Sequence, residues 1–197
     1  TYLVKKKDFW NSEFEILEDI LIPRPDTEIL IQETLKIYKN KVGISVLDIG
    51  VGSGCILLSI LKEKCSFYGT GIDICKKSIN LSEINAKKLG INNKVKFLKS
   101  DVDNFRFGKY DLIISNPPYI KKHDIKYLEK DVNCFEPKLA LDGGLEGTLK
   151  IKKVIRKASS LLKKNGKLIL EIGHNQKNIV IKLLRNKGFY INKAVKD

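Results

Sequence analysis

The sequence predicts an α/β protein with a doubly wound, mostly parallel sheet, and two observations carry this prediction. First, short apolar runs alternate along the chain with longer segments whose apolar residues recur at helical spacing. Strands separated by helices pair in parallel through right-handed crossovers, which places helices on both faces of the sheet. Second, the motifs that could bind a ligand stand directly after strands, and ligands of such sheets bind beyond the carboxyl ends of the strands.

The expected elements follow one another in a regular order. The run at 44–50 is short and apolar and ends in a glycine, as a buried strand does before a tight turn. The helix expected over 76–90 is closed by Gly90, a residue type that commonly ends helices. Further strands are expected at 67–73, 94–100, 110–115, 167–173 and 189–195, and further helices at 53–64, 148–166 and 175–188.

Length and composition limit the domain organisation. The 197 residues, of which 43% are hydrophobic and 30% charged, suffice for one core but not for two. We expect one main domain over residues 31–197, preceded by a hairpin and a lid-like segment over residues 1–30. No apolar run reaches the roughly 18 residues that span a bilayer, and the first residues lack the order of a signal peptide. The sequence therefore predicts a cytoplasmic protein with no membrane contact, and we expect a monomer.

The cysteines suggest neither a disulfide framework nor a zinc site. Cys55, Cys65, Cys75 and Cys134 form no C-x-x-C pair, and the chain has only two histidines. Structural zinc sites take four Cys or His ligands at short spacings. We therefore expect no metal.

The net charge of +14 allows two interpretations. Clustered Lys and Arg gain affinity for phosphates by releasing counterions, which would indicate a nucleic-acid partner. The lysines are scattered along the whole chain, however, as biased residue usage and solvated helix faces would produce. We expect at most weak, nonspecific binding of nucleic acid.

A glycine-rich turn follows the first strand of the main domain. "LDIGVGSG" places Asp48, Gly50, Gly52 and Gly54 between that strand and its helix. Such a turn lets the backbone approach a ligand closely and directs helix N-terminal amides toward it. Asp73 ends the next strand, where a carboxylate can accept hydrogen bonds from ribose hydroxyls. The turn therefore predicts a nucleoside-bearing cofactor, and an ordinary strand-to-helix turn is the alternative.

The spacing within this turn separates two classes of cofactor. A dinucleotide fingerprint, G-x-G-x-x-G counted from Gly50, would need a glycine where Cys55 stands. The pattern D-x-G-x-G-x-G instead resembles the S-adenosylmethionine loop of class I methyltransferases. In that loop the acidic residue, here Asp48, lies near the methionine amine, and the glycines leave room for the cofactor.

The stretch "SNPPYI" follows the strand at 110–115. Pro117 and Pro118 fix φ and remove two backbone donors, so the segment is stiff and its carbonyl oxygens have no partners within it. The side-chain oxygen of Asn116 and the backbone oxygen of Pro117 could each accept one hydrogen of a substrate NH₂ group, while the ring of Tyr119 packs on a planar group. The motif resembles the Asn-Pro-Pro-Tyr motif of methyltransferases that act on planar NH₂ nitrogens. These are amino groups of nucleic-acid bases or the amide of glutamine, and a strand exit without function is the alternative.

Four further stretches narrow the substrate class. They are "KDFW" at 7–10, "LIPRPDTEIL" at 21–30, "FEPKLALDGGLEG" at 135–147 and "LILEIGHNQ" at 168–176. With the Asn-Pro-Pro-Tyr motif they resemble, nearly from end to end, the family of peptide chain release factor glutamine methyltransferases. The resemblance implies a class I methyltransferase fold over residues 31–197. It implies methyl transfer from S-adenosyl-L-methionine to the amide nitrogen of the glutamine in the Gly-Gly-Gln motif of class-one release factors, with S-adenosyl-L-homocysteine as product. A methyltransferase acting on an exocyclic amino group of a DNA or RNA base is the alternative. A cofactor-binding module without catalysis is a third interpretation, which the intact motif from Asn116 to Tyr119 opposes.

The resemblance also implies roles for individual residues. Catalysis is expected from Asn116, Pro117 and Tyr119, and substrate binding from Asn116, Pro117, Pro118, Tyr119 and Glu136. Cofactor contacts are expected from Asp48, Gly50, Val51, Gly52, Ser53, Gly54, Asp73, Asp101, Val102 and Asn116. Val102 stands where many relatives have an aromatic residue at the adenine, so we expect weaker stacking there.

Several residues and both ends of the chain allow more than one interpretation. Arg24, Pro25 and Thr27 resemble part of a lid over the cofactor pocket, but a proline here can equally start a helix. Glu171 and Gln176 are expected only as a strand exit and a helix cap. Family members usually carry an N-terminal helical domain and a further strand after 189–195. We therefore expect a partial chain that lacks the last strand of the sheet.

Overall fold

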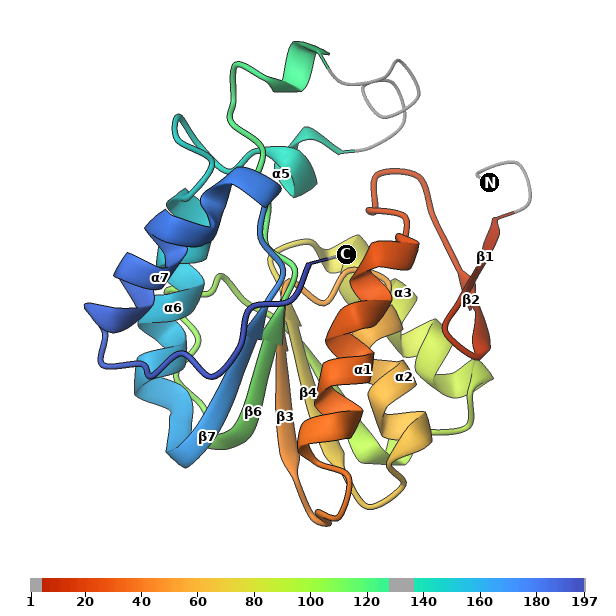
Figure 1. Ribbon diagram of the computed structural model, residues 1–197. Coiled ribbons are helices and arrows are strands. Elements are labelled where there is room, and N and C mark those ends of the chain that lie inside the picture. The colour runs from red at the N-terminus through yellow and green to blue at the C-terminus, as the bar shows by residue number, and fades with distance from the viewer. Residues whose placement is uncertain (1–4, 128–136, 197) are drawn as a thin grey trace.

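Residues 5–127 and 137–196 are described by the computed structural model of the chain, which has a central sheet covered by helices on both faces (Figure 1). The sheet has five parallel strands in the order β5-β4-β3-β6-β7, so the chain passes from one side of β3 to the other between β5 and β6. This arrangement confirms the predicted fold class. The strands are β3 (Ser45–Ile49), β4 (Tyr68–Asp73), β5 (Val95–Lys99), β6 (Tyr110–Ser115) and β7 (Leu162–Leu170).

Helices cover both faces of this sheet. The α-helices are α1 (Glu28–Ile37), α2 (Cys55–Glu63), α3 (Lys76–Lys88), α5 (Lys138–Leu141), α6 (Leu149–Leu161) and α7 (Lys177–Arg185). Single 3-10 turns are η1 (Pro25–Thr27), η2 (Asn92–Lys94), η3 (Ile125–Tyr127) and η4 (His174–Gln176). Within the described ranges, no helix combines the length and the apolar character needed to cross a membrane.

Successive strand residues point into two separate cores. Val46 and Leu112 belong to a core with α1, α2 and α3, whereas Leu47 and Ile113 belong to a core with α6. Since neither face meets water, a strand such as β6 is a nearly continuous apolar run rather than an alternating one. This explains why the short apolar runs at 44–50 and 110–115 predicted β3 and β6 correctly.

An antiparallel hairpin of β1 (Lys6–Phe9) and β2 (Ser12–Glu15) precedes the sheet, as the sequence predicts. Phe9 and Phe14 are buried, and their rings meet edge to face with 6.2 Å between centroids. At the turn, the indole Nε1 of Trp10 donates to Glu63 Oε1 of α2 over 2.8 Å. The hairpin is thus anchored on the helical face formed by α1, α2 and α3.

The helix expected over 148–166 is shorter than predicted. It ends at Leu161, and the next residues already belong to β7, whose register against β6 shifts between Tyr110 and Leu112. Asn165 lies in this irregular part with a φ of 64°. The lysines around Asn165 are typical of a solvated helix face, so the sequence predicts a longer helix. The chain must nevertheless leave the helix here so that β7 can lie beside β6.

The expectation of a strand over 189–195 is wrong. These residues form no strand, and the chain crosses toward α1, where Lys193 Nζ meets Glu33 Oε2 at 2.9 Å (Figure 1). A strand needs a neighbour to complete its backbone hydrogen bonds, and the described ranges pair no strand with this segment. Its apolar residues predict a strand, but composition cannot supply the partner.

Candidate active site

The glycine loop lies between β3 and α2 at the carboxyl edge of the sheet. Gly50, Gly52 and Gly54 have φ values of 80°, 56° and 85°, a region that residues with a Cβ rarely adopt. The backbone amides of Gly50 and Val51 donate to the carbonyl oxygen of Ile72 over 2.9 and 3.0 Å. The loop is therefore fixed to the end of the neighbouring strand by main-chain contacts.

The glycines of the loop serve two purposes. A Cβ at Gly50 or Gly52 would meet no atom within 4 Å, so these positions leave open space beside the backbone. A Cβ at Gly54 would lie 2.9 Å from Leu58 Cδ1, so this glycine allows α2 to pack closely against the loop. The first two positions thus leave room for a ligand, whereas the third combines close packing with a φ of 85° that favours glycine.

Helix α3 supports the carbonyl groups of the loop. Ser82 Oγ donates to the oxygen of Gly52 over 2.9 Å, and Asn85 Nδ2 donates to the oxygen of Ser53 over 2.9 Å. Both side chains are buried. Sequence reasoning missed them, although two polar residues within the buried face of a helix are a visible signal, because buried polar groups need partners.

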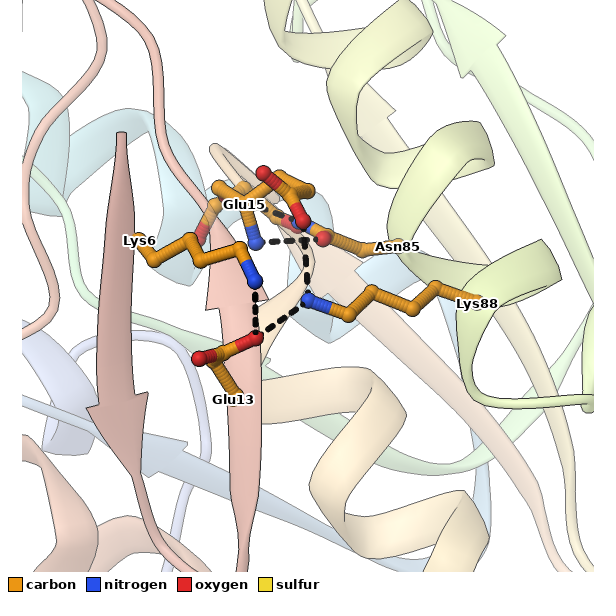
Figure 2. A network of polar contacts seen from close by, with 6 residues as sticks. Lys6, Glu13, Glu15, Asn85 and Lys88 are labelled. Atoms are coloured by element: carbon orange, nitrogen blue, oxygen red, sulfur yellow. Dashed lines mark hydrogen bonds and ion pairs between the residues drawn. The ribbon is translucent and has the colours of Figure 1, made fainter. Parts of the chain in front are cut away.

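Asn85 also ties the loop to the hairpin. Its Oδ1 accepts from the amide of Glu15 over 2.8 Å, and its Nδ2 donates to the oxygen of Glu15 over 3.1 Å. Figure 2 shows this contact beside an ion-pair cluster in which Lys88 meets Glu13 at 2.7 Å and Glu15 at 2.8 Å, and Lys6 meets Glu13 at 2.9 Å. One buried amide therefore connects β2, α3 and the glycine loop.

Two carboxylates stand at the ends of β3 and β4. Asp48 is 1% exposed, and neither of its side-chain oxygens has a hydrogen-bond partner. Burial, followed by the charge of Asp73, raises the pKa of Asp48 to about 7. Asp73 accepts from the amides of Gly52 over 3.0 Å and Cys75 over 2.8 Å, while burial raises its pKa. A buried acidic group without a partner, next to an open loop, fits a ligand that brings an ammonium group.

Asp101 and Val102 lie in the turn after β5. Asp101 Oδ1 accepts from the amide of Asp103 over 2.7 Å, which holds the turn in shape. Val102 is half-buried and packs against the core that includes Ile49 and Ile72, residues near the ends of β3 and β4. The structure therefore brings the turn to the edge that carries the glycine loop, and an adenine contact remains a prediction.

The residues after β6 line a cavity of about 380 Å³. Asn116 Nδ2 donates to Thr27 Oγ1 of η1 over 3.3 Å, so the segment before α1 reaches the motif. The lining residues are Leu21, Arg24, Asn116, Pro117, Pro118, Tyr119, Ile120, Ala140, Leu141 and Glu171. Four of the five residues expected at the substrate are thus together, and the fifth, Glu136, lies outside the described residues.

The segment at 24–27 begins a helix, the second of its two interpretations, and also reaches the cavity. Pro25 is the first residue of η1, which leads directly into α1, so it does start a helix. Arg24 lines the cavity, and Thr27 is buried against Asn116. A lid movement remains a prediction.

Gln176 and Glu171 do more than the strand exit and helix cap that the sequence suggests. Gln176 Nε2 donates to the oxygens of Tyr119 and Gly147 over 2.9 and 3.0 Å, and its Oε1 accepts from the amide of Gly173 over 3.0 Å. Gln176 therefore fixes the backbone of the Asn-Pro-Pro-Tyr motif at Tyr119. Glu171 lies in the cavity wall, where burial raises the pKa of its carboxyl group.

Comparison with known proteins supports the same kind of site. A family model described as "Methyltransferase domain" matches residues 40–196. The chain is 35% identical to the release factor glutamine methyltransferase of Caulobacter vibrioides over its whole length and 68% of that protein. It is 38% identical to the protein of that name in Fusobacterium nucleatum, again over its whole length but only 56% of that protein. Together these matches cover the glycine loop and the Asn-Pro-Pro-Tyr motif.

Solved structures with similar folds are more distant. The ribosomal protein L11 methylase of Lactobacillus delbrueckii superposes with a TM-score of 0.67 at 20% identity, over 90% of this chain and 76% of that one. A methyltransferase of Geobacter sulfurreducens, solved with S-adenosyl-L-homocysteine, gives 0.52 at 20% identity, over 75% and 49%. These two matches indicate the fold alone. The sequence matches show that the chain belongs to the release factor glutamine methyltransferase family and forms its S-adenosylmethionine-dependent methyltransferase domain.

Proposed function

We propose that this chain methylates the side-chain amide nitrogen of the glutamine in the Gly-Gly-Gln motif of class-one release factors. The observation that carries the proposal is the cavity lined by Asn116 to Tyr119, in which Asn116 donates from Nδ2 to Thr27 and so leaves its Oδ1 as an acceptor for a substrate N–H. The names of relatives that are 35% and 38% identical support the same substrate. The chain spans about two thirds of the first relative and little more than half of the second, so the rest of those proteins is not represented here.

The glycine loop and its carboxylates would hold S-adenosyl-L-methionine. Asp48, whose oxygens have no partner, would accept a hydrogen bond from the methionine ammonium, and the carboxylate of Asp73 would accept hydrogen bonds from the ribose hydroxyls. The loop residues Gly50, Val51, Gly52, Ser53 and Gly54 would surround the methionine portion, with Asp101 and Val102 at the adenine. When bound, the cofactor supplies a methyl group on a positively charged sulfur, which is electrophilic.

The chain's own residues would act by orientation. Asn116 Oδ1 and the oxygen of Pro117 would accept the two N–H groups of the substrate amide, and the ring of Tyr119 would pack on its plane. The lone pair of an amide nitrogen is delocalised, so it reacts only when it is held in line with the methyl group. Fixed geometry of this kind can contribute about 7 to 11 kcal/mol in favourable cases. The proton can leave to water after methyl transfer, so the motif needs no base.

The substitution Asn116→Ala tests this proposal. Loss of the oriented acceptor should lower the single-turnover rate roughly a hundred- to a thousandfold, because the substrate amide is no longer held. Cofactor affinity, measured by calorimetric titration, should stay within a few-fold. Asn116→Asp is the matched variant, since it keeps an acceptor oxygen and nearly the same shape, and some activity should survive.

The substrates should be a release factor with Gly-Gly-Gln, the same factor with that glutamine replaced, and duplex DNA. Transfer to the replaced factor, or full activity of Asn116→Ala, would overturn the proposal. Transfer to DNA but not to the release factor would favour a base amino methyltransferase, the alternative that the net charge of +14 allows.

A further inference from the structure

Glu171 is the first residue after β7 and shares the cavity wall with Asn116 and Tyr119. Its amide donates to the oxygen of Ser115, the last residue of β6, over 3.1 Å, so the main chain places it beside the start of the motif. Its carboxyl group lies beside the side chains of Thr27, Asn116 and Tyr119, three groups that can donate to it and that lower its pKa. One of its oxygens, Oε2, is buried without a hydrogen-bond partner.

These contacts determine which groups donate and which accept in the hydrogen bonds around Asn116. A hydroxyl group can donate or accept, so Thr27 alone would allow either orientation of the Asn116 amide. An ionised carboxylate can only accept, so Thr27 must donate to Glu171 and is left with lone pairs. Asn116 then meets only acceptors on this side and must turn its Nδ2 toward them, as the 3.3 Å contact from Nδ2 to Thr27 Oγ1 shows.

We propose that Glu171, acting with Thr27, is a positioning residue that fixes the Asn116 amide with its oxygen toward the substrate. The inference rests on the proposed function, because it concerns the same site. It also explains why the site would select an amide group over a carboxylate. A site that presents Asn116 Oδ1 and the Pro117 oxygen accepts a group with two N–H donors, whereas the carboxylate of a glutamate would place oxygens against oxygens.

The inference predicts a dependence on pH. Burial raises the pKa of Glu171, the negative charge of Asp26 raises it further, and the neighbouring donor groups of Thr27, Asn116 and Tyr119 oppose the shift. Arg24, which also lines the cavity, interacts electrostatically with Tyr119. Once protonated, Glu171 can donate, and Asn116 is then free to turn its oxygen toward Glu171. The rate of methyl transfer should therefore fall as the pH drops through the pKa of Glu171.

The substitution Glu171→Gln in the whole chain tests this role. A glutamine keeps the shape but can donate as well as accept, so the direction of the bonds is lost. The single-turnover rate on a Gly-Gly-Gln release factor should fall about 10- to 100-fold, by analogy with the loss of groups that orient metal ligands through hydrogen bonds. The dissociation constant for S-adenosyl-L-methionine should stay within about threefold, and the fall in rate at low pH should disappear. Glu146→Gln, which changes a side chain that is 70% exposed, is the matched control and should behave as wild type.

Thr27→Val removes the hydroxyl at similar shape and gives an independent test. It should show the same loss of rate at unchanged cofactor affinity, and the double variant should lose little more than either single one, because both changes break one chain of bonds. If Glu171→Gln fails to fold, Thr27→Val and Thr27→Ser decide the matter, since only the serine should retain the wild-type rate.

The outcomes separate this inference from the proposed function. Wild-type transfer to the Gly-Gly-Gln factor, and not to the factor with its glutamine replaced, is measured first and tests the function alone. Given that activity, a wild-type rate and pH profile in Glu171→Gln or in Thr27→Val would reject the positioning role. A loss of cofactor affinity that accounts for the whole loss of rate would reject it as well.

Discussion

Asp48 is a carboxyl group that folding buries without giving it a hydrogen-bond partner. An unpaired buried charge is unfavourable, and its raised pKa of about 7 expresses this cost. Such an arrangement is useful if a ligand brings the missing positive group, since the cost is removed on binding. The buried carboxylate of Asp48 should therefore contribute to the affinity for a cofactor that carries an ammonium group.

The substitution Asp48→Asn should weaken S-adenosyl-L-methionine binding. Loss of a charged hydrogen bond to the ammonium should cost roughly 1.5 to 3 kcal/mol, or about 10- to 100-fold in the dissociation constant. Calorimetric titration measures this change. Unchanged affinity in a folded variant would remove Asp48 from the cofactor site.

The same variant should alter how stability depends on pH. Between the ordinary pKa of 3.8 and about 7, native Asp48 holds a proton that the unfolded chain has released. The free energy of unfolding of the wild type should therefore fall as the pH rises through this window. Asp48→Asn lacks this contribution, so its unfolding free energy should fall less between pH 5 and pH 8 without cofactor. Denaturant titrations at several pH values measure the difference, and identical slopes would contradict the assignment.

At the scale of elements, α3 is the support on which the glycine loop rests. Ser82 and Asn85 hold two of the loop's carbonyl groups, and Asn85 simultaneously holds the backbone of β2. The hairpin and the loop are far apart in the sequence, but they share this one side chain. A substitution in the hairpin should therefore change the affinity of the cofactor site.

The variants Asn85→Ala and Lys88→Ala form a matched pair within the network of Figure 2. Asn85→Ala leaves buried backbone groups without partners, which should cost about 1 to 3 kcal/mol and lower the melting temperature by roughly 2 to 4 °C per kcal/mol. Cofactor affinity should fall with it, because the oxygen of Ser53 loses its donor. Lys88→Ala breaks only ion pairs near the surface, which solvent screens, so both quantities should change little. Equal effects of the two changes would show that the buried amide has no special role.

At the scale of the whole molecule, the positive charge is spread over many elements. Ion pairs occur on the hairpin, at Lys153 and Arg156 of α6 with Asp103, and at Lys193 of the C-terminal segment with Glu33 of α1. We expect weak binding of duplex DNA without sequence preference, and an affinity that falls with salt at a log-log slope near −0.9 per phosphate contacted. Fluorescence anisotropy at several salt concentrations checks this. Tight binding to one sequence would favour the base methyltransferase.

The sequence alone predicts those features of the fold and the site that a short local pattern of residues determines. The glycine loop at Gly50 to Gly54 and the motif at Asn116 to Tyr119 follow strands that apolar runs reveal, and parallel pairing brings both to one edge. The roles of Asn85 and Glu171 depend on which distant segments fold against them, and no local pattern encodes this. The strand expected at 189–195 fails for a related reason, because a strand depends on its neighbour as well as on its own residues.

The hydrogen bonds of Gln176 affect how a substrate can enter the cavity. One side chain binds the backbone at Tyr119, Gly147 and Gly173, and the two prolines of the motif already restrict its torsions. Such a receptor has little freedom to adapt its shape during an encounter, so the incoming peptide must make the adjustment. In the proposed Gly-Gly-Gln substrate, the two glycines before the glutamine give the peptide that freedom. The stiffness of this loop therefore favours a pliable partner, and rigid segments that carry a glutamine should be poor substrates.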